Sequence, residues 1–308
     1  MNESTTETSV GAELESRTWA DWLTLTKPRI SSFIFFAGFV GALLAAGSST
    51  EWASAVEVGI WVACLGAGAS AFNQVIERDT DRIMVRTRNR PLPAGRISPA
   101  AAIAFASTLA LAGAVGLGLR FGMLSALLGL ATLCAYTLVY TPLKRLSLIN
   151  TLIGAIPGGM PPLIGYAAMS SAENPVGGWG VALFAVIFAW QFPHFMAIAW
   201  LHREDYARAG MRMLPATEGS AGQAGRQAVC YSLVLLPVSL VPLLRGDAGF
   251  VYGIGAMILG LVYVAASVAF GFEENRKRAK VLLYVSLAYL PALLMLAIFD
   301  PAVGIFGS

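Results

Sequence analysis

Three oxygen-bearing side chains recur at four-residue intervals near the end of a long apolar stretch: Asn73, Glu77 and Asp81. On a helix, each four-residue step turns by about 40°, so the three would project from one face. One amide oxygen and two carboxylates are hard ligands of the kind that Mg²⁺ takes while it keeps waters and substrate phosphates. The spacing therefore predicts a magnesium site; the alternative is a helix end that meets water. Asp79 falls off this face and is expected to be solvated or paired with an arginine.

Cationic side chains follow these acids at two points in the chain. The segment 86–93 reads Arg-Thr-Arg-Asn-Arg-Pro-Leu-Pro, and Lys144 and Arg145 follow Tyr140-Thr-Pro. A diphosphate group needs such partners, because arginine forms bidentate hydrogen bonds to phosphate and cations neutralise charge that develops on a leaving group. We expect Arg90, Lys144 and Arg145 to bind a diphosphate. The alternative is that they set membrane topology or contact lipid headgroups.

A diphosphate head in this polar region would leave an isoprenoid tail among apolar side chains. When the diphosphate departs, it leaves an allylic carbocation that aromatic faces can stabilise. The aromatic candidates are Phe72, Tyr136, Tyr140 and Tyr166.

Two histidines, His194 and His202, are the only ones in the chain. Eight residues of helix separate them by about 80°, so they lie on roughly the same side. Pro193 should disturb that helix and free a backbone carbonyl. Imidazole is a common iron ligand in haem proteins, whereas the alternative is a hydrogen-bonded core histidine. A second irregular stretch, 153–165, is rich in proline and glycine, and we expect it to be a pocket wall or a structural kink.

The elements that position these groups are membrane-spanning helices. The chain has 308 residues, is 56% hydrophobic and only 13% charged, and has a mean hydropathy of +0.67. Apolar runs near 20 residues recur, each long enough to cross a bilayer core of about 30 Å. We expect an all-α integral membrane protein with nine spans, at roughly 30–47, 54–78, 98–118, 121–140, 148–168, 179–201, 227–244, 249–271 and 281–299.

The distribution of positive charge orients these spans. With the N-terminus in the cytoplasm, all Lys and Arg residues except Arg120 and Arg245 lie on the cytoplasmic side. The C-terminus is then outside. The polar segment 1–26 is expected to be a disordered cytoplasmic tail, followed by one membrane domain over 27–308. Arg-x-Leu-Pro-Ala follows acidic residues at both 90–94 and 212–216, which suggests an internal duplication.

Several segments now resemble a known family. The Asn73-x-x-x-Glu77-x-x-x-Asp81 pattern, followed by 86–93, resembles the first aspartate-rich motif of the UbiA superfamily of membrane prenyltransferases. The segments 140–145, 157–165, 190–195 and 206–215 are similar to the haem branch of that superfamily. The resemblance extends over nearly the whole chain from about Lys27.

The resemblance implies nine helices around a central cavity, Mg²⁺ as cofactor, farnesyl diphosphate and haem B as substrates, and haem O as product. Asn73, Glu77 and Asp81 would hold the diphosphate through Mg²⁺, with Arg90, Lys144 and Arg145 gripping it. The residues implied for haem binding are His194, His202, Tyr206, Glu204 and Asp205. The expected location is the bacterial cytoplasmic (inner) membrane, with the active-site loops in the cytoplasm. Haem-modifying and oxidase-assembly proteins are candidate partners, and no nucleic acid partner is expected.

Two positions depart from the superfamily pattern. Glu77 replaces the usual aspartate, which keeps the charge but lengthens the reach. The second motif is reduced to Glu204 and Asp205, which makes a full second magnesium site doubtful and favours pairing with loop arginines.

Two other functions compete with this interpretation. A sister enzyme that prenylates an aromatic quinone precursor would share the first motif but would not need His194. A transporter would share the repeated bundle, but its binding groups are expected at the midplane and not at one membrane surface.

Overall fold

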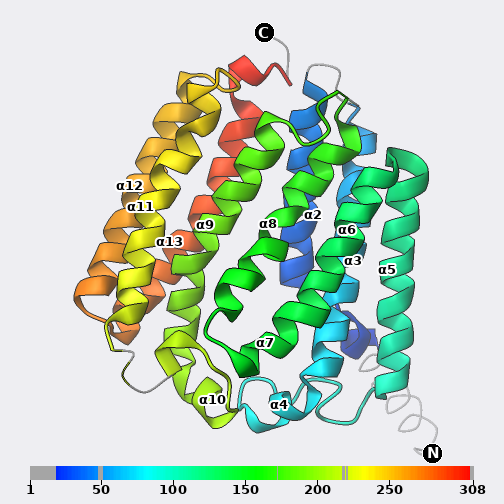
Figure 1. Ribbon diagram of the computed structural model, residues 1–308, viewed down its shortest axis with the longest axis vertical. Coiled ribbons are helices and arrows are strands. Elements are labelled where there is room, and N and C mark those ends of the chain that lie inside the picture. Colours follow the sequence, from blue (N-terminus) through cyan, green and yellow to red (C-terminus); the bar gives the residue numbers. More distant parts are fainter. Residues whose placement is uncertain (1–18, 48–50, 172, 217–218, 220, 306–308) are drawn as a thin grey trace, which may run out of the picture.

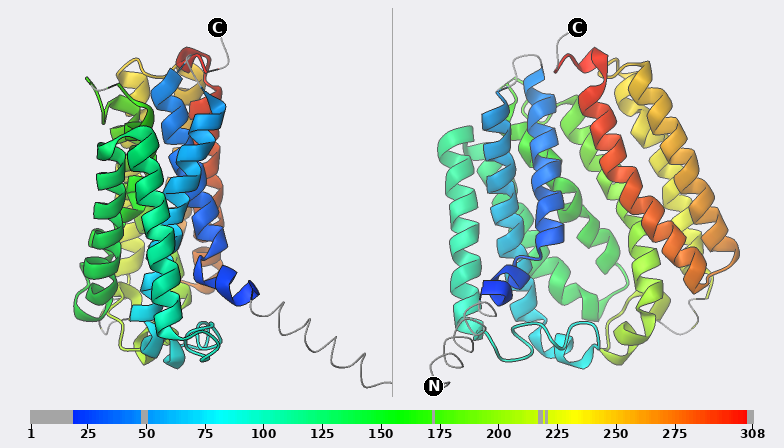
Figure 2. Two further views of the ribbon diagram at one scale, coloured as in Figure 1. Left: turned by 90° about the vertical axis from the view of Figure 1, so that its right-hand side faces the viewer. Right: turned by 180° about the vertical axis from the view of Figure 1, so that it is seen from behind.

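The structure, a computed structural model, describes residues 19–47, 51–171, 173–216, 219 and 221–305. Within this part of the chain, nine helical segments are long and apolar enough to cross a membrane, as predicted. They stand side by side in a flattened bundle (Figures 1 and 2). The spans are α2 (Pro28–Ala46), α3 (Trp52–Ile76), α5 (Pro99–Phe121), α6 with η2 and α7 (Met123–Leu146), α8 (Asn150–Met169), α9 (Gly178–Leu201), α11 (Gln223–Leu244), α12 (Phe250–Phe272) and α13 (Arg276–Phe299).

Local sequence explains where several of these helices begin. Ser98 caps α5 by accepting a hydrogen bond from the Ala101 amide, and Pro99 follows at the first helical position. Asn275 caps α13 in the same way through the Arg278 amide. Gly122, at φ 98°, provides the tight turn between α5 and α6.

The helices pack in an order that repeats along the chain. α3 packs on α2 and α5, while α9 packs on α8 and α11. A short helix follows each of these central helices at the same end of the bundle: α4 (Arg78–Ile83) after α3 and α10 (Arg203–Arg208) after α9 (Figure 1). An Arg-x-Leu-Pro-Ala loop follows each short helix. This correspondence is what the internal duplication predicts.

α8 is continuous, although its sequence suggested an interrupted span. Pro157, Pro161 and Pro162 lie inside the helix. Glycines on both helices allow a very close approach of α8 to α2: a Cβ added at Gly41 of α2 would lie 2.0 Å from the carbonyl oxygen of Pro162, and one at Gly165 of α8 would lie 1.9 Å from that of Gly38. Small residues at membrane helix interfaces permit such contacts. The glycines of this stretch therefore serve helix packing.

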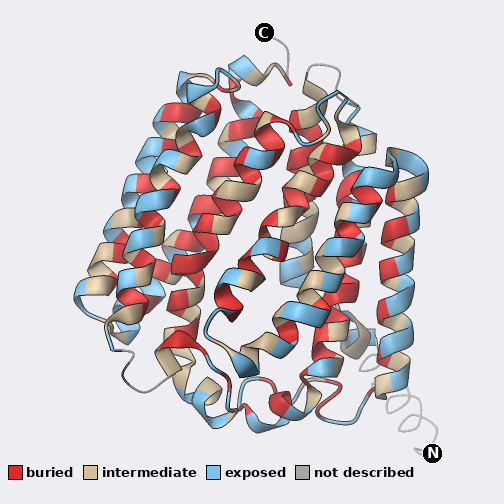
Figure 3. Cartoon of the chain, in the orientation of Figure 1, coloured by how far each residue is buried: buried red, intermediate tan, exposed pale blue. Residues whose placement is uncertain are grey.

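Burial divides the bundle into an inner and an outer set of faces (Figure 3). α9 is the most buried span, with 61% of its apolar window inside the protein, whereas α5 has 28%. The outer faces carry exposed apolar side chains such as Leu119 on α5 and Phe272 on α12. In a membrane such faces contact lipid, so the chain is an integral membrane protein whose polar chemistry lies within the bundle and at its ends.

The described part of the predicted N-terminal tail, residues 19–26, is ordered. Residues 1–18 lie outside the described residues, but residues 19–25 are helical. Leu25 is fully buried, the Trp22 ring lies 5.0 Å from the Phe105 ring, and Asp21 pairs with Arg96 at 2.8 Å. The predicted disorder is therefore wrong for residues 19–26, because this segment packs its apolar side against the start of α5.

Candidate active site

Asn73, Glu77 and Asp81 come together at the junction of α3 and α4. The sequence predicted a single helix, but α3 ends at Ile76 and Glu77 is the joint between the two helices. The Glu77 amide donates to the Asn73 carbonyl at 2.9 Å, and the Asp81 amide donates to the Glu77 carbonyl at 2.7 Å. Because of these two bonds, the helical spacing of four residues continues from α3 into α4. The three side chains are buried, at 1%, 7% and 0% exposure.

Each member of this set is paired with a cation. Lys144 on α7 donates to Glu77 Oε1 at 2.8 Å, and Arg90 donates to Asp81 Oδ2 at 2.8 Å. Burial alone would raise the pKa of Glu77, but the neighbouring Lys144 and Lys27 outweigh burial and hold that pKa below its ordinary value. Glu77 is therefore a carboxylate at neutral pH. The prediction that Arg90 and Lys144 lie beside the acids agrees with the structure.

Lys27 is the member of this cluster that the sequence did not reveal, because it was counted only as a topology-determining charge. Its Nζ donates to Asn73 Oδ1 at 2.8 Å. Among the described non-glycine residues, Lys27 alone has a positive φ, 49°, directly before Pro28. Backbone strain of this kind persists where surrounding structure imposes it, and it is common at functional sites. One feature of the sequence could have revealed Lys27: it stands directly before Pro28 at the start of a span, at the same membrane surface as the acids.

Lys27 can gain or lose its proton near neutral pH. Burial, together with the nearby cations Lys144 and Arg90, lowers the pKa of Lys27 to about 7. An anion that enters the cluster would favour the protonated form. Lys27 is therefore poised to gain a full charge when phosphate oxygens bind.

One carboxylate oxygen of the cluster has no protein partner. Asp81 Oδ1 is buried and makes no hydrogen bond with the described residues. Such an atom is costly unless something binds it. No group of three or more His, Cys, Asp or Glu side chains in the described part of the chain could hold a metal alone. Two carboxylates and an amide nevertheless fit Mg²⁺, which is commonly held by one or two carboxylates plus substrate phosphates.

Aromatic side chains line the inner side of this cluster. The six residues 135–140 form a π-helix, η2, a rare element that is frequent at functional sites. It places the Tyr140 ring 4.7 Å below Lys144 Nζ and 5.2 Å from the Tyr136 ring. Thr141 accepts a hydrogen bond from Asn73 at 3.2 Å. Tyr136 and Tyr140 are therefore the two predicted aromatic candidates that lie beside the ionic cluster.

Other predicted residues lie apart from the cluster. Arg145 is exposed, and none of the ion pairs among the described residues includes it. Asp79 is 73% exposed and pairs with Arg78 and Arg82, as expected for its off-face position. Tyr166 lies in the last turns of α8, at the opposite end of that helix from Asn150. Phe72 packs in an apolar cluster around Leu25 and Leu92.

His194 is buried within α9 in a precise set of contacts. It is 9% exposed, and its Nδ1 lies 2.8 Å from Ser286 Oγ on α13. Its ring stacks on Trp190, with centroids 4.7 Å apart and planes 20° apart. Pro193 is accommodated within the helix, which continues to Leu201. No sequence pattern indicated the contact with α13.

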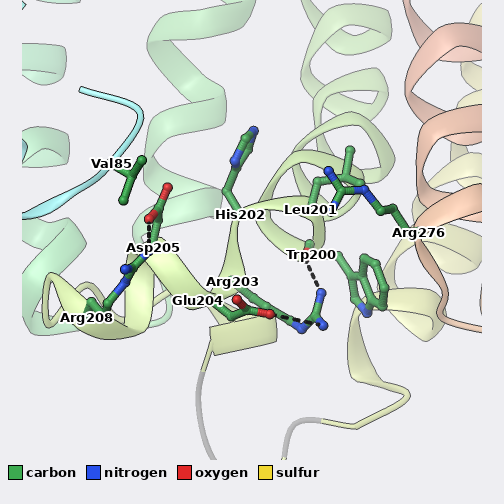
Figure 4. A pocket seen from close by; sticks show the side chains of 9 residues that line it. All are labelled: Val85, Trp200, Leu201, His202, Arg203, Glu204, Asp205, Arg208 and Arg276. Atoms are coloured by element: carbon green, nitrogen blue, oxygen red, sulfur yellow. Dashed lines mark hydrogen bonds and ion pairs between the residues drawn. The ribbon is translucent and has the colours of Figure 1, made fainter. Parts of the chain in front are cut away.

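His202 lies at the end of α9, beside a pocket of about 300 Å³. Figure 4 shows the side chains of α9, α10 and the start of α13 that surround this pocket. Arg276 contributes a guanidinium from α13, and Arg203 lies over the Trp200 ring at 4.1 Å. Burial and the nearby Arg86 lower the pKa of His202. The pocket is thus a polar hollow lined by three arginines and two acids, about two helical turns beyond His194.

The acids of α10 are occupied by neighbouring arginines. Glu204 lies 3.6 Å from Arg203, and Asp205 forms an ion pair with Arg208 (Figure 4). Tyr206 packs among methionines of the following loop, including Met211. These pairs match the expectation of arginine-paired acids.

Two hydrogen bonds to the backbone of Arg212 join the loop after α10 to α7 and α8. The Arg212 amide donates to the Lys144 carbonyl at 2.9 Å, and Asn150 Nδ2 donates to the Arg212 carbonyl at 2.7 Å. The loop after α10 is therefore fixed directly to α7, which carries Lys144.

Known proteins resemble this chain in sequence over most of its length. Residues 34–290 match the UbiA prenyltransferase family. The chain belongs to this family. It is similar to a protein named protoheme IX farnesyltransferase from Solibacter usitatus (strain Ellin6076), with 40% identity over 289 residues, which cover 91% of this chain and 98% of the relative. A protein of the same name from Marinobacter nauticus is 38% identical and covers 92% of both chains.

Solved structures share the fold of this UbiA family member at lower sequence identity. A structure described as digeranylgeranylglyceryl phosphate synthase has a TM-score of 0.75 and 18% identity, and covers 93% of this chain and 99% of its own. A UbiA homologue from Archaeoglobus fulgidus bound to GPP and Mg²⁺ has a TM-score of 0.62 and 15% identity, and covers 90% and 99%. The all-helical prenyltransferase fold is thus confirmed, and the chain is a membrane enzyme of this family.

Proposed function

We propose that this enzyme transfers the farnesyl group of farnesyl diphosphate to a vinyl group of haem B and, with hydration, forms haem O. The observation that carries the proposal is the buried cluster in which Asn73, Glu77 and Asp81 are each paired with a cation. The similarity to proteins named protoheme IX farnesyltransferase supports the choice of acceptor.

The paired cluster suits a diphosphate that arrives with a divalent metal ion. Such a substrate brings both negative oxygens and a cation, so each charged side chain can exchange its present partner for a new one. Lys27, Arg90 and Lys144 would turn to phosphate oxygens. Asn73, Glu77 and Asp81 would hold the metal, and the free Oδ1 of Asp81 is already available to it. Mg²⁺ fits this donor set, and when bound it supplies charge neutralisation on the leaving group.

The chemical step is then the departure of diphosphate. The bond between farnesyl C1 and the bridging oxygen breaks, and its electron pair leaves with the diphosphate. Lys144 and Arg90 stabilise that developing charge. The faces of Tyr136 and Tyr140 stabilise the allylic cation on the other side of the broken bond. The vinyl π electrons of haem form the new carbon–carbon bond, and water adds to the resulting cation and loses a proton.

The haem is proposed to lie along the inner side of α9. His194 would bind its iron, since imidazole is a common haem ligand. About 12 Å further along the helix axis, at a rise of 1.5 Å per residue, His202 and the adjoining pocket would receive the carboxylates of the porphyrin. Arg276 is the cation best placed to pair with them. Glu204 and Asp205 line this pocket from α10, and Tyr206, which is proposed to support the site, packs behind them against the methionines of the next loop.

The proposed location is the bacterial cytoplasmic membrane. The short helices α4, α7 and α10 lie at one end of the bundle, and η4 (Pro301–Val303), the last described element, lies at the other (Figure 1). The excess of Lys and Arg at the first end supports its placement in the cytoplasm. Haem-modifying and oxidase-assembly proteins remain the proposed protein partners.

The decisive assay uses the purified chain with farnesyl diphosphate, haem B and Mg²⁺. We expect a more hydrophobic haem whose mass has increased by one farnesyl group plus one hydroxyl group, because the added water loses a proton. Turnover of 4-hydroxybenzoate in place of haem would contradict the proposal and favour an aromatic prenyltransferase. Omission of Mg²⁺, with and without Mn²⁺ added back, tests the choice of metal.

A further inference from the structure

Ser286 lies opposite His194, near the middle of α13. It is completely buried. Its hydroxyl donates to the Leu283 carbonyl one turn earlier in α13, at an oxygen–oxygen distance of 2.6 Å. The same Oγ lies 2.8 Å from Nδ1 of His194. Ser286 thus makes two short polar contacts, one within its helix and one to α9.

The position of the Ser286 hydroxyl proton determines which ring nitrogen of His194 is protonated. Two oxygen atoms 2.6 Å apart repel unless a proton lies between them, so the proton of Ser286 points to the Leu283 carbonyl. Towards His194, Oγ can then only accept a hydrogen bond. Nδ1 of His194 must therefore carry the ring proton. In a neutral imidazole the other nitrogen, Nε2, is left with a free lone pair.

A second set of contacts fixes the plane of the ring. Trp190 donates from its indole nitrogen to the backbone carbonyl of Ser286 at 2.8 Å, while its ring stacks on His194. Tyr263 in turn donates to the Trp190 carbonyl at 3.0 Å. Among the described residues, all hydrogen bonds of the His194 side chain are made through Nδ1. Ser286 therefore contacts both aromatic partners of the stack, one through its side chain and one through its backbone.

We propose that Ser286 is a positioning residue that holds His194 in the Nδ1–H tautomer and thereby presents Nε2 as the ligand for the iron of the haem substrate. This inference rests on the haem site of the proposed function. Ligating histidines generally donate their other ring nitrogen to a neighbouring acceptor, which fixes the ring and raises its basicity. Here the acceptor is a hydroxyl, which is held in its accepting role by a backbone carbonyl.

The tautomer can be tested without activity, because the chain contains only two histidines. The full chain, labelled with ¹⁵N-histidine and placed in lipid nanodiscs, is compared with a His202→Asn variant that leaves His194 as the only imidazole. We expect one protonated nitrogen, Nδ1, and one unprotonated nitrogen, Nε2. A wild-type spectrum with the proton on Nε2 would overturn the inference.

Haem titrations test the role of Ser286. In Ser286→Ala we expect the affinity for ferric haem to fall by about 10–100-fold and the Soret band to move towards that of His194→Ala. Affinity for farnesyl diphosphate should be unchanged. Ser232→Ala is the matched control, because Ser232 is equally buried and its hydroxyl donates to its own helix at Val229. Ser286→Thr keeps the hydroxyl and should restore the wild-type spectrum.

The outcomes distinguish the positioning role of Ser286 from haem ligation by His194. If Ser286→Ala and wild type give the same haem affinity and spectrum while His194→Ala loses both, the positioning role is wrong and haem ligation stands. If His194→Ala also leaves the haem spectrum unaltered, the proposed haem ligand is wrong and the inference about Ser286 is lost with it. Formation of haem O by the wild type tests the proposed reaction separately.

Discussion

Replacement of Asp81 by Asn tests the ionic cluster most directly. The side chain keeps its shape and one of its two oxygens, but it loses the negative charge that faces Arg90 at 2.8 Å, and a single oxygen cannot serve both Arg90 and a metal. Hydrogen bonds to charged groups contribute about 1.5–3 kcal/mol each. If about 3 kcal/mol of transition-state stabilisation is lost, the rate falls by about a hundredfold or more, since each 1.36 kcal/mol is a factor of ten.

Diphosphate release measured at several Mg²⁺ concentrations is the appropriate assay. We expect Asp81→Asn to need more Mg²⁺ for half-maximal rate, because the amide oxygen remains a weaker ligand. The matched control is Asp79→Asn, two residues away on the same short helix, 73% exposed and paired only at the surface. This control should behave as wild type. Equal loss in both variants, or normal turnover in Asp81→Asn, would refute the assignment of the cluster.

Three further predictions concern the cations and the length of one acid. The affinity of the wild type for farnesyl diphosphate should fall as the pH rises above about 7, by about tenfold per unit at most, because the ligand-free protein has lost the Lys27 proton that the complex holds. Binding curves for Lys27→Arg should lack this component; an identical slope would contradict it. Lys144→Ala should raise the KM for farnesyl diphosphate, whereas Arg145→Ala, which removes an exposed cation, should not; a reversed order would place the wrong residue in the site. Glu77→Asp shortens the reach to Lys144, so initial rates should drop while the protein stays folded; unchanged rates would show that the longer side chain is unnecessary.

The sequence predicted the spans well because membrane crossing depends on length and apolarity, which are local properties. It misplaced the end of the second span, since Glu77 is a joint that no propensity marks. It also ended the fourth span at residue 140, whereas helical structure continues to Leu146 through the π-helix and Pro142. Proline near a helix start is tolerated, so it did not stop this segment.

The site was predictable where its residues are close in the chain and hidden where they are distant. Asn73, Glu77 and Asp81 share a spacing, and the charges of Glu77 and Asp81 are costly enough near a membrane to be noticed. Lys27 and Ser286 meet their partners only after the bundle closes, 46 and 92 positions away. A serine in an apolar helix resembles any small packing residue. Its role depends on a contact between α9 and α13, which periodicity does not encode.

Because acids and cations pair with one another in the ligand-free cluster, the cluster also disfavours binding of the abundant anions of the cell. A bare phosphate or carboxylate that attracted Lys144 and Arg90 would strand Glu77 and Asp81 in a buried setting, at a cost of several kcal/mol. A ligand that carries its own divalent ion provides a cation for the two acids as well as oxygens for the two basic side chains. Selection at this entrance is therefore made on whether the incoming ligand carries a cation together with its anion, as much as on its shape.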